Sequence, residues 1–506
     1  MSLNLAYILR ESAKVDPAKP ALLFDGGQIS YGQLDAMTDQ FARGLVAAGY
    51  RPGDRIGLQL PNLPQFVIAY FGILKAGCVA VPMNVLLKAP EIAYQLGNSR
   101  SSALISWSGT AAEAVKAVEA AGVKHLYIVN TPGIPNATVG ETFESLMGAD
   151  PTSPAPLAHR DPGDTAVLIY TSGTTGTPKG AELTHFQLLS NADTPGRVFG
   201  LQPEDVTLVV LPLFHVFGLS SLLNVGMRFG ATLTLVPRFE PQKVLEVIKR
   251  DKVTIFAGVP TMYLALLAEP GVTSEDVDSL RIGISGGAAI PAEVIDSFEE
   301  RFGVLILEGY GLTETASTTT FNVSAEERRV YSVGKPIWGV DVQIWGEHDE
   351  PLGRGEQNVG EIVVRGTNVM KGYWDDPEAT AAAFCRGWFR TGDLGYVDDD
   401  GFVFIVDRKK DLVIRGGYNV YPREIEEVLY THPAIAEAAV IGVPDPRLGE
   451  EVKAFVALKP GQHATSEEII EFVKERVAAY KYPRLVEFHA AFEHGATGKI
   501  LKHMLR

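Results

Sequence analysis

The chain has 506 residues, 46% hydrophobic and 21% charged, a composition typical of a globular protein that is too long for one hydrophobic core. Its 45 Lys and Arg against 61 Asp and Glu give a formal net charge of −16, which disfavours nucleic acid as a partner. Cys78 and Cys385 lack metal-ligand spacing and suit a reducing compartment. With no evident signal peptide or transmembrane segment, a cytoplasmic location is expected, and peripheral membrane contact stays open.

The first third of the chain alternates predicted strands and helices. Short apolar runs predict strands over 21–24, 55–60, 78–82, 103–106 and 125–129. Apolar residues at helical spacing predict helices over 33–48 and 64–75. Repeated βα units of this kind predict a mostly parallel sheet covered by helices.

The rest of the chain changes character twice. A Pro-, Ala- and Asp-rich stretch at 150–164 predicts a loop between subdomains, and a second α/β region follows over 165–330. Beyond residue 336, β runs at 340–344, 360–364 and 401–405 predict a small β-barrel-like section. A compact α+β tail begins near Asp411, and its clearest predicted helix covers 466–480.

The most informative segment is Thr171-Ser172-Gly173-Thr174-Thr175-Gly176-Thr177-Pro178-Lys179-Gly180. It follows a predicted strand at 166–170 and precedes a predicted helix start with Thr184 as N-cap. Glycines allow close backbone approach, and hydroxyls add donors for phosphate oxygens. We therefore expect a polyanion-binding loop between a strand and a helix. The loop is not a Walker A motif, because Pro178 precedes Lys179 and Gly180 follows it.

Four further segments carry candidate chemistry. Glu308-Gly309-Tyr310-Gly311-Leu312-Thr313-Glu314 offers an aromatic for an adenine ring and a carboxylate for Mg²⁺. Trp388-Phe389-Arg390-Thr391-Gly392-Asp393 places an acid after a glycine turn, suited to ribose hydroxyls. The charged run 406–411 lies between the β section and the tail, where a flexible joint would be needed. Ala496-Thr497-Gly498-Lys499-Ile500 places a lysine on a loop near the C-terminus.

In this order and spacing, the five segments are similar to the signature motifs of the acyl-adenylate-forming superfamily, which includes acyl-CoA synthetases, peptide-synthetase adenylation domains and luciferases. The chain resembles the bacterial fatty-acyl-CoA synthetase branch from about residue 10 to its end, although Ala496 stands where many relatives have proline. The resemblance implies α/β and α+β domains. These are an N-terminal domain (1–407) of two α/β subdomains and a β-barrel-like subdomain, a hinge (408–411) containing Lys410, and a mobile C-terminal domain (412–506).

The resemblance also implies the reaction, its cofactors and the site residues. The carboxylate of an acid attacks ATP to give acyl-AMP, and CoA then displaces AMP, with Mg²⁺ assisting the first step. The ATP site would comprise Thr171, Ser172, Gly173, Thr174, Thr175, Gly176, Lys179, Gly287, Ala288, Glu308, Gly309, Tyr310, Gly311, Thr313, Asp393, Ile405, Arg408, Lys410, Gly416, Gly417 and Lys499. Thr171, Lys179, His215, Glu314 and Lys499 would be catalytic, with Glu314 and Thr171 near the metal.

The acyl pocket implied by the resemblance consists of one histidine, as a wall or gate, and of apolar and small residues. They are His215, Phe217, Gly258, Val259, Ser285, Gly286 and Gly311. The segments around them contain no Arg or Lys, which disfavours a dicarboxylate and favours a medium- or long-chain fatty acid. A benzoate- or cinnamate-type aryl acid is the main alternative.

Other functions and the assembly stay open at this point. A carrier protein could replace CoA as acceptor. Gly283-Ile284-Ser285-Gly286-Gly287 also fits the nucleophile elbow of a serine hydrolase, with Ser285 as nucleophile. Monomer and homodimer are both compatible with the sequence.

Overall fold

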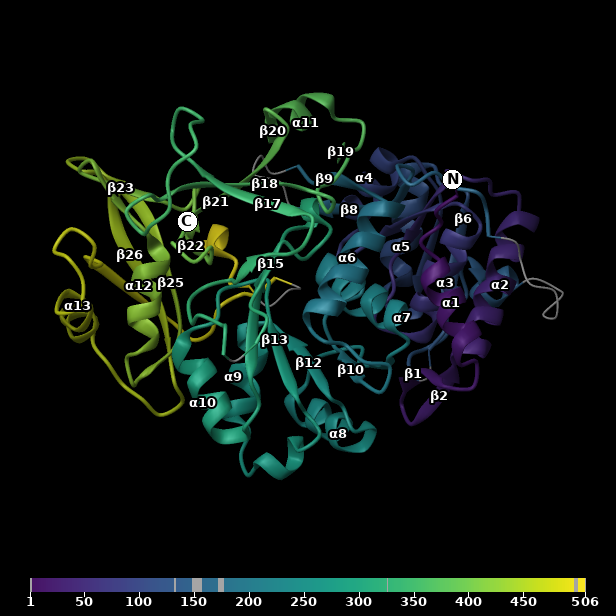
Figure 1. Cartoon of the computed structure of the whole chain (residues 1–506), viewed down its shortest axis with the longest axis horizontal. Helices are drawn as coiled ribbons and strands as arrows, with labels where there is room; N and C mark the ends of the chain where they lie inside the picture. The colour runs from purple at the N-terminus through teal and green to yellow at the C-terminus, as the bar shows by residue number, and fades with distance from the viewer. Residues whose placement is uncertain are drawn as a thin grey trace.

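A computed structural model describes residues 2–131, 133–147, 157–171, 177–324, 326–495 and 499–505. Two helix-covered α/β sheets, a smaller antiparallel sheet and a C-terminal unit meet around the centre of the molecule (Figure 1). The predicted fold class is confirmed. Among the described residues, we find no helix with the length and apolarity needed to cross a membrane.

The first sheet has the strand order β19-β9-β8-β4-β3-β5-β6-β7. Neighbouring strands pair in parallel from β8 through to β7. Its strands are β3 (Arg55–Leu58), β4 (Val79–Pro82), β5 (Ser101–Trp107), β6 (His125–Val129), β7 (Glu141–Thr142), β8 (Thr165–Thr171), β9 (Lys179–Thr184) and β19 (Gly372–Tyr373). The helices of this region are α1 (Tyr7–Val15), α2 (Tyr31–Ala47), α3 (Pro64–Lys75), α4 (Ala89–Ser99), α5 (Ala111–Ala121) and α6 (His185–Val198).

The second sheet has the order β16-β15-β14-β13-β12-β10-β11-β1-β2, with parallel pairing from β14 through β1. Its strands are β1 (Pro20–Phe24), β2 (Gly27–Ser30), β10 (Val206–Val209), β11 (Thr232–Leu235), β12 (Ile255–Gly258), β13 (Ile282–Ser285), β14 (Ile306–Tyr310), β15 (Thr320–Phe321) and β16 (Lys335–Pro336). Helices α7 (Val225–Phe229), α8 (Pro241–Asp251), α9 (Pro260–Ala268) and α10 (Ala292–Phe302) follow its strands.

The third sheet is antiparallel and contains the β runs predicted beyond residue 336. Its order is β17-β18-β21-β20, with β22 paired to β21. These strands are β17 (Val340–Trp345), β18 (Gly360–Gly366), β20 (Phe384–Cys385), β21 (Trp388–Val397) and β22 (Val403–Arg408), and α11 (Pro377–Ala383) precedes β20.

The C-terminal unit packs its own hydrophobic core, which includes Val413, Ile425, Val440, Val456 and Ile469. Its elements are β23 (Val413–Arg415), β24 (Tyr418–Val420), α12 (Pro422–Tyr430), β25 (Ile435–Asp445), β26 (Gly449–Leu458), α13 (Ser466–Lys474), β27 (Leu485–His489) and the short helix η6 (Lys502–Leu505). A separate core of this kind is what an independently moving unit requires.

Three expectations from the sequence need correction. Residue Lys179 begins strand β9, so the phosphate-type loop joins two antiparallel strands and not a strand to a helix. The predicted 466–480 helix ends at Lys474, because the chain then turns and stacks Tyr480 on Tyr418. Strand β1 lies in the second sheet beside β11, because pairing partners are chosen across the fold and not by sequence order.

Thr184, in contrast, is the N-cap of α6, as predicted. Its hydroxyl accepts from the Gln187 N–H at 3.2 Å, while the Thr184 N–H donates to Gln187 Oε1 at 2.8 Å. This reciprocal pair is a capping box, which satisfies donors that the first turn of a helix leaves free.

Candidate functional site

The predicted pocket segments follow neighbouring parallel strands of the second sheet. His215 and Phe217 come after β10, Val259 after β12, and Gly286 after β13. Because carboxyl ends of parallel strands meet at one sheet edge, the fold brings these segments together. The Cβ of any side chain at Gly286 would lie 3.1 Å from the Phe217 ring, so this ring and the β13 turn are in close apposition.

Tyr310, at the end of β14, is joined to the third sheet. Its hydroxyl donates to Asp393 Oδ2 at 2.5 Å, and Arg408 Nε lies 2.8 Å from Asp393 Oδ1. Asp393 and Arg408 are register partners on β21 and β22, so the antiparallel pairing itself sets this ion pair. The predicted adenine-side and ribose-side residues are thus in direct contact. Ile405, also predicted at this site, lies on the same strand, β22, three residues before Arg408.

Glu314 lies on the short helix η5 (Thr313–Thr315), immediately beyond β14. The Tyr373 hydroxyl donates to Glu314 Oε1 at 2.9 Å, and the Met370 N–H donates to the Glu314 carbonyl at 2.7 Å. Desolvation raises the pKa of Glu314 above its ordinary value, because it penalises the charged form, and this outweighs the opposing Tyr373 hydrogen bond and Arg408 charge. Among the described residues no cluster of three or more His, Cys, Asp or Glu side chains could hold a metal ion.

Thr171 and Lys179 flank the glycine- and threonine-rich loop and pair across the β8–β9 ladder. The Lys179 ammonium lies 5.4 Å from the centre of the Tyr373 ring, whose hydroxyl binds Glu314. Lys179, Tyr373 and Glu314 are therefore neighbours. The predicted residues Ser172, Gly173, Thr174, Thr175 and Gly176 lie outside the described part of the chain.

Lys499, near the C-terminus, lies close to these site residues. Desolvation by the surrounding groups, together with the charges of Arg408 and Lys410, lowers its pKa to about 8, and Asp393 opposes the shift. The residue nevertheless keeps contact with solvent. Burial likewise lowers the pKa of His215 to about 4, with a contribution from the Lys499 charge. Lys499 is thus within electrostatic reach of His215, Arg408 and Asp393, although more than 90 residues separate it from each of them.

His215 is neutral near pH 7, since its pKa is about 4. Its Nδ1 accepts a 3.3 Å hydrogen bond from the Phe217 N–H, so the remaining proton is on Nε2. A neutral ring suits a pocket wall beside an apolar acyl group, and it does not add charge next to Lys499.

Glu308 is buried in the middle of β14. Its Oε1 accepts from the Ile290 N–H at 3.3 Å, whereas Oε2 has no hydrogen-bond partner in the described structure. Burial raises its pKa to about 7, against the opposing charge of Arg423 in α12. Such a costly group lies where ATP is expected to bind, which is typical of functional sites.

The glycines of the 308–314 segment are required by packing inside the protein. A Cβ at Gly311 would lie 1.3 Å from the Ser317 carbonyl oxygen, and one at Gly309 would lie 2.5 Å from Phe321. Gly287 has φ +81°, a left-handed conformation that favours glycine, and Ala288 follows it in the turn after β13.

Ser285 does not form a hydrolase site in the described structure. It is the last residue of β13, is fully buried, and its hydroxyl has no hydrogen-bond partner in the described chain, hence no histidine base. An activated serine needs a base within hydrogen-bond reach. The geometry therefore disfavours the nucleophile-elbow interpretation.

Two predicted ATP-site residues lie elsewhere in this arrangement. Gly416 and Gly417 form the β23–β24 turn, and the Gly416 N–H donates to the Leu448 carbonyl. Strand β23 is on the outer side of the C-terminal unit, far from β13 (Figure 1). Lys410 is exposed, and its charge reaches Lys499.

The sequence did not predict two residues that contact members of this site. Tyr373 and Glu361 lie on strands β19 and β18, and Glu361 binds Arg390 at 2.7 Å and Lys409 at 3.1 Å. A tyrosine after Gly372 and a glutamate in a β run look like ordinary sheet residues, since only the tertiary pairing brings them near Glu314 and the 406–411 run.

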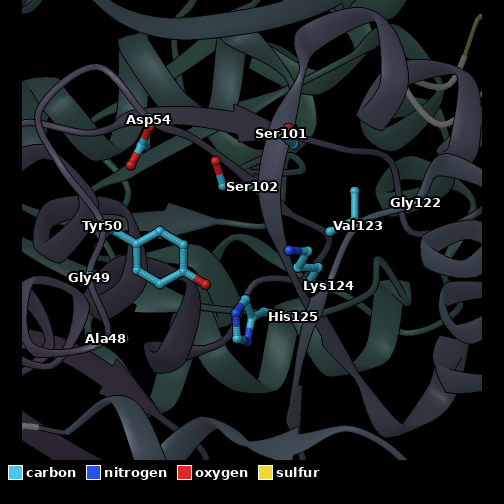
Figure 2. A pocket seen from close by; sticks show the side chains of 10 residues that line it. All are labelled: Ala48, Gly49, Tyr50, Asp54, Ser101, Ser102, Gly122, Val123, Lys124 and His125. Atoms are coloured by element: carbon cyan, nitrogen blue, oxygen red, sulfur yellow. The ribbon is translucent and has the colours of Figure 1, made fainter.

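A separate hollow of about 410 Å³ is lined by Tyr50, Asp54, Ser102, Lys124 and His125, among others (Figure 2). These residues precede or begin β3, β5 and β6, so they lie at the amino ends of parallel strands. In Figure 2 the Tyr50 ring points toward His125. His125 pairs with Glu141 at 3.1 Å and Tyr50 with the Tyr127 hydroxyl at 3.3 Å, so neighbouring side chains already use these groups.

Comparison with known proteins agrees with the geometry. Residues 9–374 match the family model described as AMP-binding enzyme, and residues 424–499 match that of the AMP-binding enzyme C-terminal domain. A long-chain-fatty-acid–CoA ligase of Bacillus subtilis (strain 168) is 39% identical, over 99% of this chain and 94% of that protein. A feruloyl-CoA synthase of an Amycolatopsis species is also 39% identical, over 98% of this chain and 96% of that protein. The structure of ATP-bound MatB from Rhodopseudomonas palustris superposes with a TM-score of 0.92 at 34% identity, covering 100% and 98% of the two chains.

Proposed function

We propose that this chain, which belongs to the AMP-binding enzyme family and is an AMP-forming acyl-CoA ligase, uses a medium- or long-chain fatty acid as its substrate. The observation that carries this proposal is the apolar character of the segment after β10 and of the ends of β12 and β13. Stretches 216–219, 256–259 and 283–286 contain no charged side chain. An acid with a second charged group would find no partner there, and burying an unpaired charge is costly.

An aryl acid is the second candidate, because the feruloyl-CoA synthase is as similar as the fatty-acid ligase. Apolar walls discriminate weakly between the two, since each methylene changes binding by about 0.8 kcal/mol. The choice therefore needs an experiment.

We infer the following roles for the site residues in the first step. A carboxylate oxygen of the acid attacks the α-phosphorus of ATP, and the bond to the bridging oxygen of pyrophosphate breaks. Both reactants are anions, so neutralising charge lowers the barrier. Lys499 and Lys179 supply positive charge, assisted by Thr171 and the 172–176 donors. Tyr310 packs on the adenine with Gly287 and Ala288, and Asp393 with Arg408 holds the ribose.

Glu314 fits a Mg²⁺ ligand. It is a partly buried carboxylate held by Tyr373, and Mg²⁺ typically binds one or two carboxylates together with substrate phosphates. When bound, the ion would neutralise charge on the ATP phosphates.

In the second step the CoA thiolate attacks the acyl carbonyl carbon and AMP leaves. We propose that the C-terminal domain (412–506) turns on the 408–411 hinge at Lys410 to withdraw Lys499 and bring Gly416 and Gly417 to the site. The present arrangement, with Lys499 at the strand ends, suits the first step. Hinge closure of this kind is a recognised class of motion.

Basic residues of the C-terminal unit are candidates for binding the CoA phosphates. In this arrangement Lys409 pairs with Glu361, Arg415 with Glu451 and Lys481 with Glu424. These cations would have to exchange partners before they could bind CoA. We further propose a cytoplasmic enzyme, since ATP and CoA are found there, acting as a monomer or homodimer.

A pyrophosphate-release screen across carboxylic acids, with and without CoA, tests the substrate. We expect the highest kcat/KM for fatty acids of about eight or more carbons, because each added methylene strengthens binding to an apolar pocket. Thioester should form only when CoA is added. Highest activity on ferulate or benzoate would favour the aryl alternative. Release that CoA fails to convert to thioester would favour a carrier-protein acceptor.

A further inference from the structure

A partly buried cluster of charged residues lies at the interface between the third sheet and the C-terminal unit, here called the seam. Lys502 Nζ is 2.7 Å from Glu426 Oε1, which joins helix η6 to helix α12. The Asp407 carboxylate, at the end of β22, is within electrostatic reach of the Lys502 ammonium. Lys502 thus faces acids from both sides of the seam.

The same seam is crossed by hydrogen bonds from Arg423 in α12. Its N–H donates to Asp407 Oδ2 at 2.9 Å, and its Nη1 donates to the Ile405 carbonyl at 2.7 Å. Arg423 Nε is also 3.0 Å from Glu427 Oε1, so its guanidinium is held in place. Asp407 therefore ties the last strand of the third sheet to the first turn of α12.

Lys502 is three residues beyond Lys499, and the chain between them is fixed at both ends. On one side, His494 bridges Ile500, the Gly495 N–H donates to the Lys499 carbonyl at 2.8 Å, and the Leu501 N–H donates to Glu493. On the other side, the Lys502–Glu426 pair holds the segment against α12. A position held at both ends by tertiary contacts is pre-organised, and small displacements of such a group are costly in rate.

Burial opposes a charged Lys502, yet the charges of Glu426 and Asp407 outweigh it and raise the pKa of Lys502. Removing this cation leaves the buried Asp407 and the partly buried Glu426 without its charge, which loosens the seam.

We propose that Lys502, through Glu426 and Asp407, is a positioning residue that holds Lys499 in the site for the adenylate-forming step. The Lys502–Glu426 pair is dispensable for the thioester-forming step, in which Lys499 has to leave the site. This inference rests on the proposed two-step use of the C-terminal domain, and it does not depend on which acid is the substrate.

The test compares Lys502→Met and Glu426→Gln with Lys502→Arg. Glu426→Gln keeps an oxygen to accept the 2.7 Å bond from the Val440 N–H, while removing the negative charge. Lys474→Met is the matched control, because Lys474 lies in the same unit but is exposed and pairs with Glu471 within α13. Single-turnover acyl-AMP formation and thioester formation from supplied acyl-AMP are measured separately.

We expect Lys502→Met to slow acyl-AMP formation on the order of 10- to 100-fold, and Glu426→Gln to slow it in the same direction. The thioester step should be unchanged in both variants, Lys502→Arg should recover most of the loss, and Lys474→Met should match wild type. An equal fall in both half-reactions, no change in either, or failure of Lys502→Arg to recover would overturn the proposal.

Hydrogen exchange supplies a readout that does not need activity. In Lys502→Met the amides of 408–424 should exchange faster than in wild type, because the Arg423 N–H bond to Asp407 would open more often. Unchanged exchange there would also overturn the proposal. If wild type activated no fatty acid, the substrate assignment would fail while this arm would still decide the role of Lys502.

Discussion

The Tyr310 hydroxyl donates a 2.5 Å hydrogen bond to Asp393, and this contact joins the edge of a parallel sheet to an antiparallel one. Asp393 also accepts from Arg408, so one carboxylate holds both the Tyr310 hydroxyl and the Arg408 guanidinium. Its two oxygens are both engaged before a nucleotide arrives.

Asp393→Asn tests this arrangement. An amide offers one acceptor oxygen in place of two, so it cannot serve both Tyr310 and Arg408 while binding ribose. We expect the KM for ATP to rise by about tenfold or more, as for loss of a charge-assisted hydrogen bond. Steady-state kinetics at saturating acid give the measurement, and an unaltered KM for ATP would argue against a ribose role.

The pH dependence of adenylation should follow Lys499. Its pKa in the free enzyme is lowered to about 8, so the ammonium is charged below this pH and neutral above it. The kcat/KM for ATP should therefore fall as pH rises through about 8, because kcat/KM reports groups of the free enzyme. Lys499→Arg keeps its charge, so its profile should lack this alkaline limb even if its absolute rate is lower. An identical limb in both enzymes would assign the ionisation to another group.

Stability should depend on pH through Glu308. Its pKa is raised from 4.5 to about 7 in the folded protein, so the folded state retains a proton that the unfolded state has released. Stability from this group is therefore present below about pH 4.5 and is lost as pH rises through about 7. Glu308→Gln keeps the acceptor for the Ile290 N–H and cannot ionise.

Thermal unfolding of the two proteins checks this prediction. At pH 8 the Gln variant should be more stable than wild type by about 1–3 kcal/mol, and near pH 5 the difference should shrink toward zero. A gain in stability that is the same at both pH values would show that the effect comes from packing and not from the charge.

Acyl selectivity should respond to Phe217, whose ring packs against Gly286. Phe217→Ala opens space at the strand ends, so kcat/KM for bulky or branched acids should rise relative to that for a straight-chain acid. Phe229→Ala, at the end of α7 and outside the predicted pocket, serves as the control and should leave the ratio near that of wild type. Equal ratios in all three proteins would remove Phe217 from the acyl pocket.

The sequence predicted the α/β organisation well, because buried strands and amphipathic helices have clear periodicity. It also predicted that the ends of β12, β13 and β14 carry site residues. It missed strand β9, since Lys179-Gly180-Ala181 has little strand character on its own. It extended the 466–480 helix beyond its observed end at Lys474, because the Tyr480–Tyr418 stack that turns the chain is a tertiary contact.

Contacts between distant segments could not be predicted in the same way. The Tyr373 bond to Glu314 and the Lys502 pair with Glu426 depend on how whole sheets and units pack, and no local pattern records that. The resemblance to family motifs predicted Lys499 as a site residue, and the structure shows which charged groups surround it.

The account depends most directly on Lys499 acting in only one of the two steps. In Lys499→Ala, acyl-AMP formation should fall on the order of 10²–10³-fold, as for loss of one well-aimed charge donor, while thioester formation from supplied acyl-AMP and CoA should stay near the wild-type rate. An equal loss in both half-reactions would contradict the proposed withdrawal of Lys499 from the site.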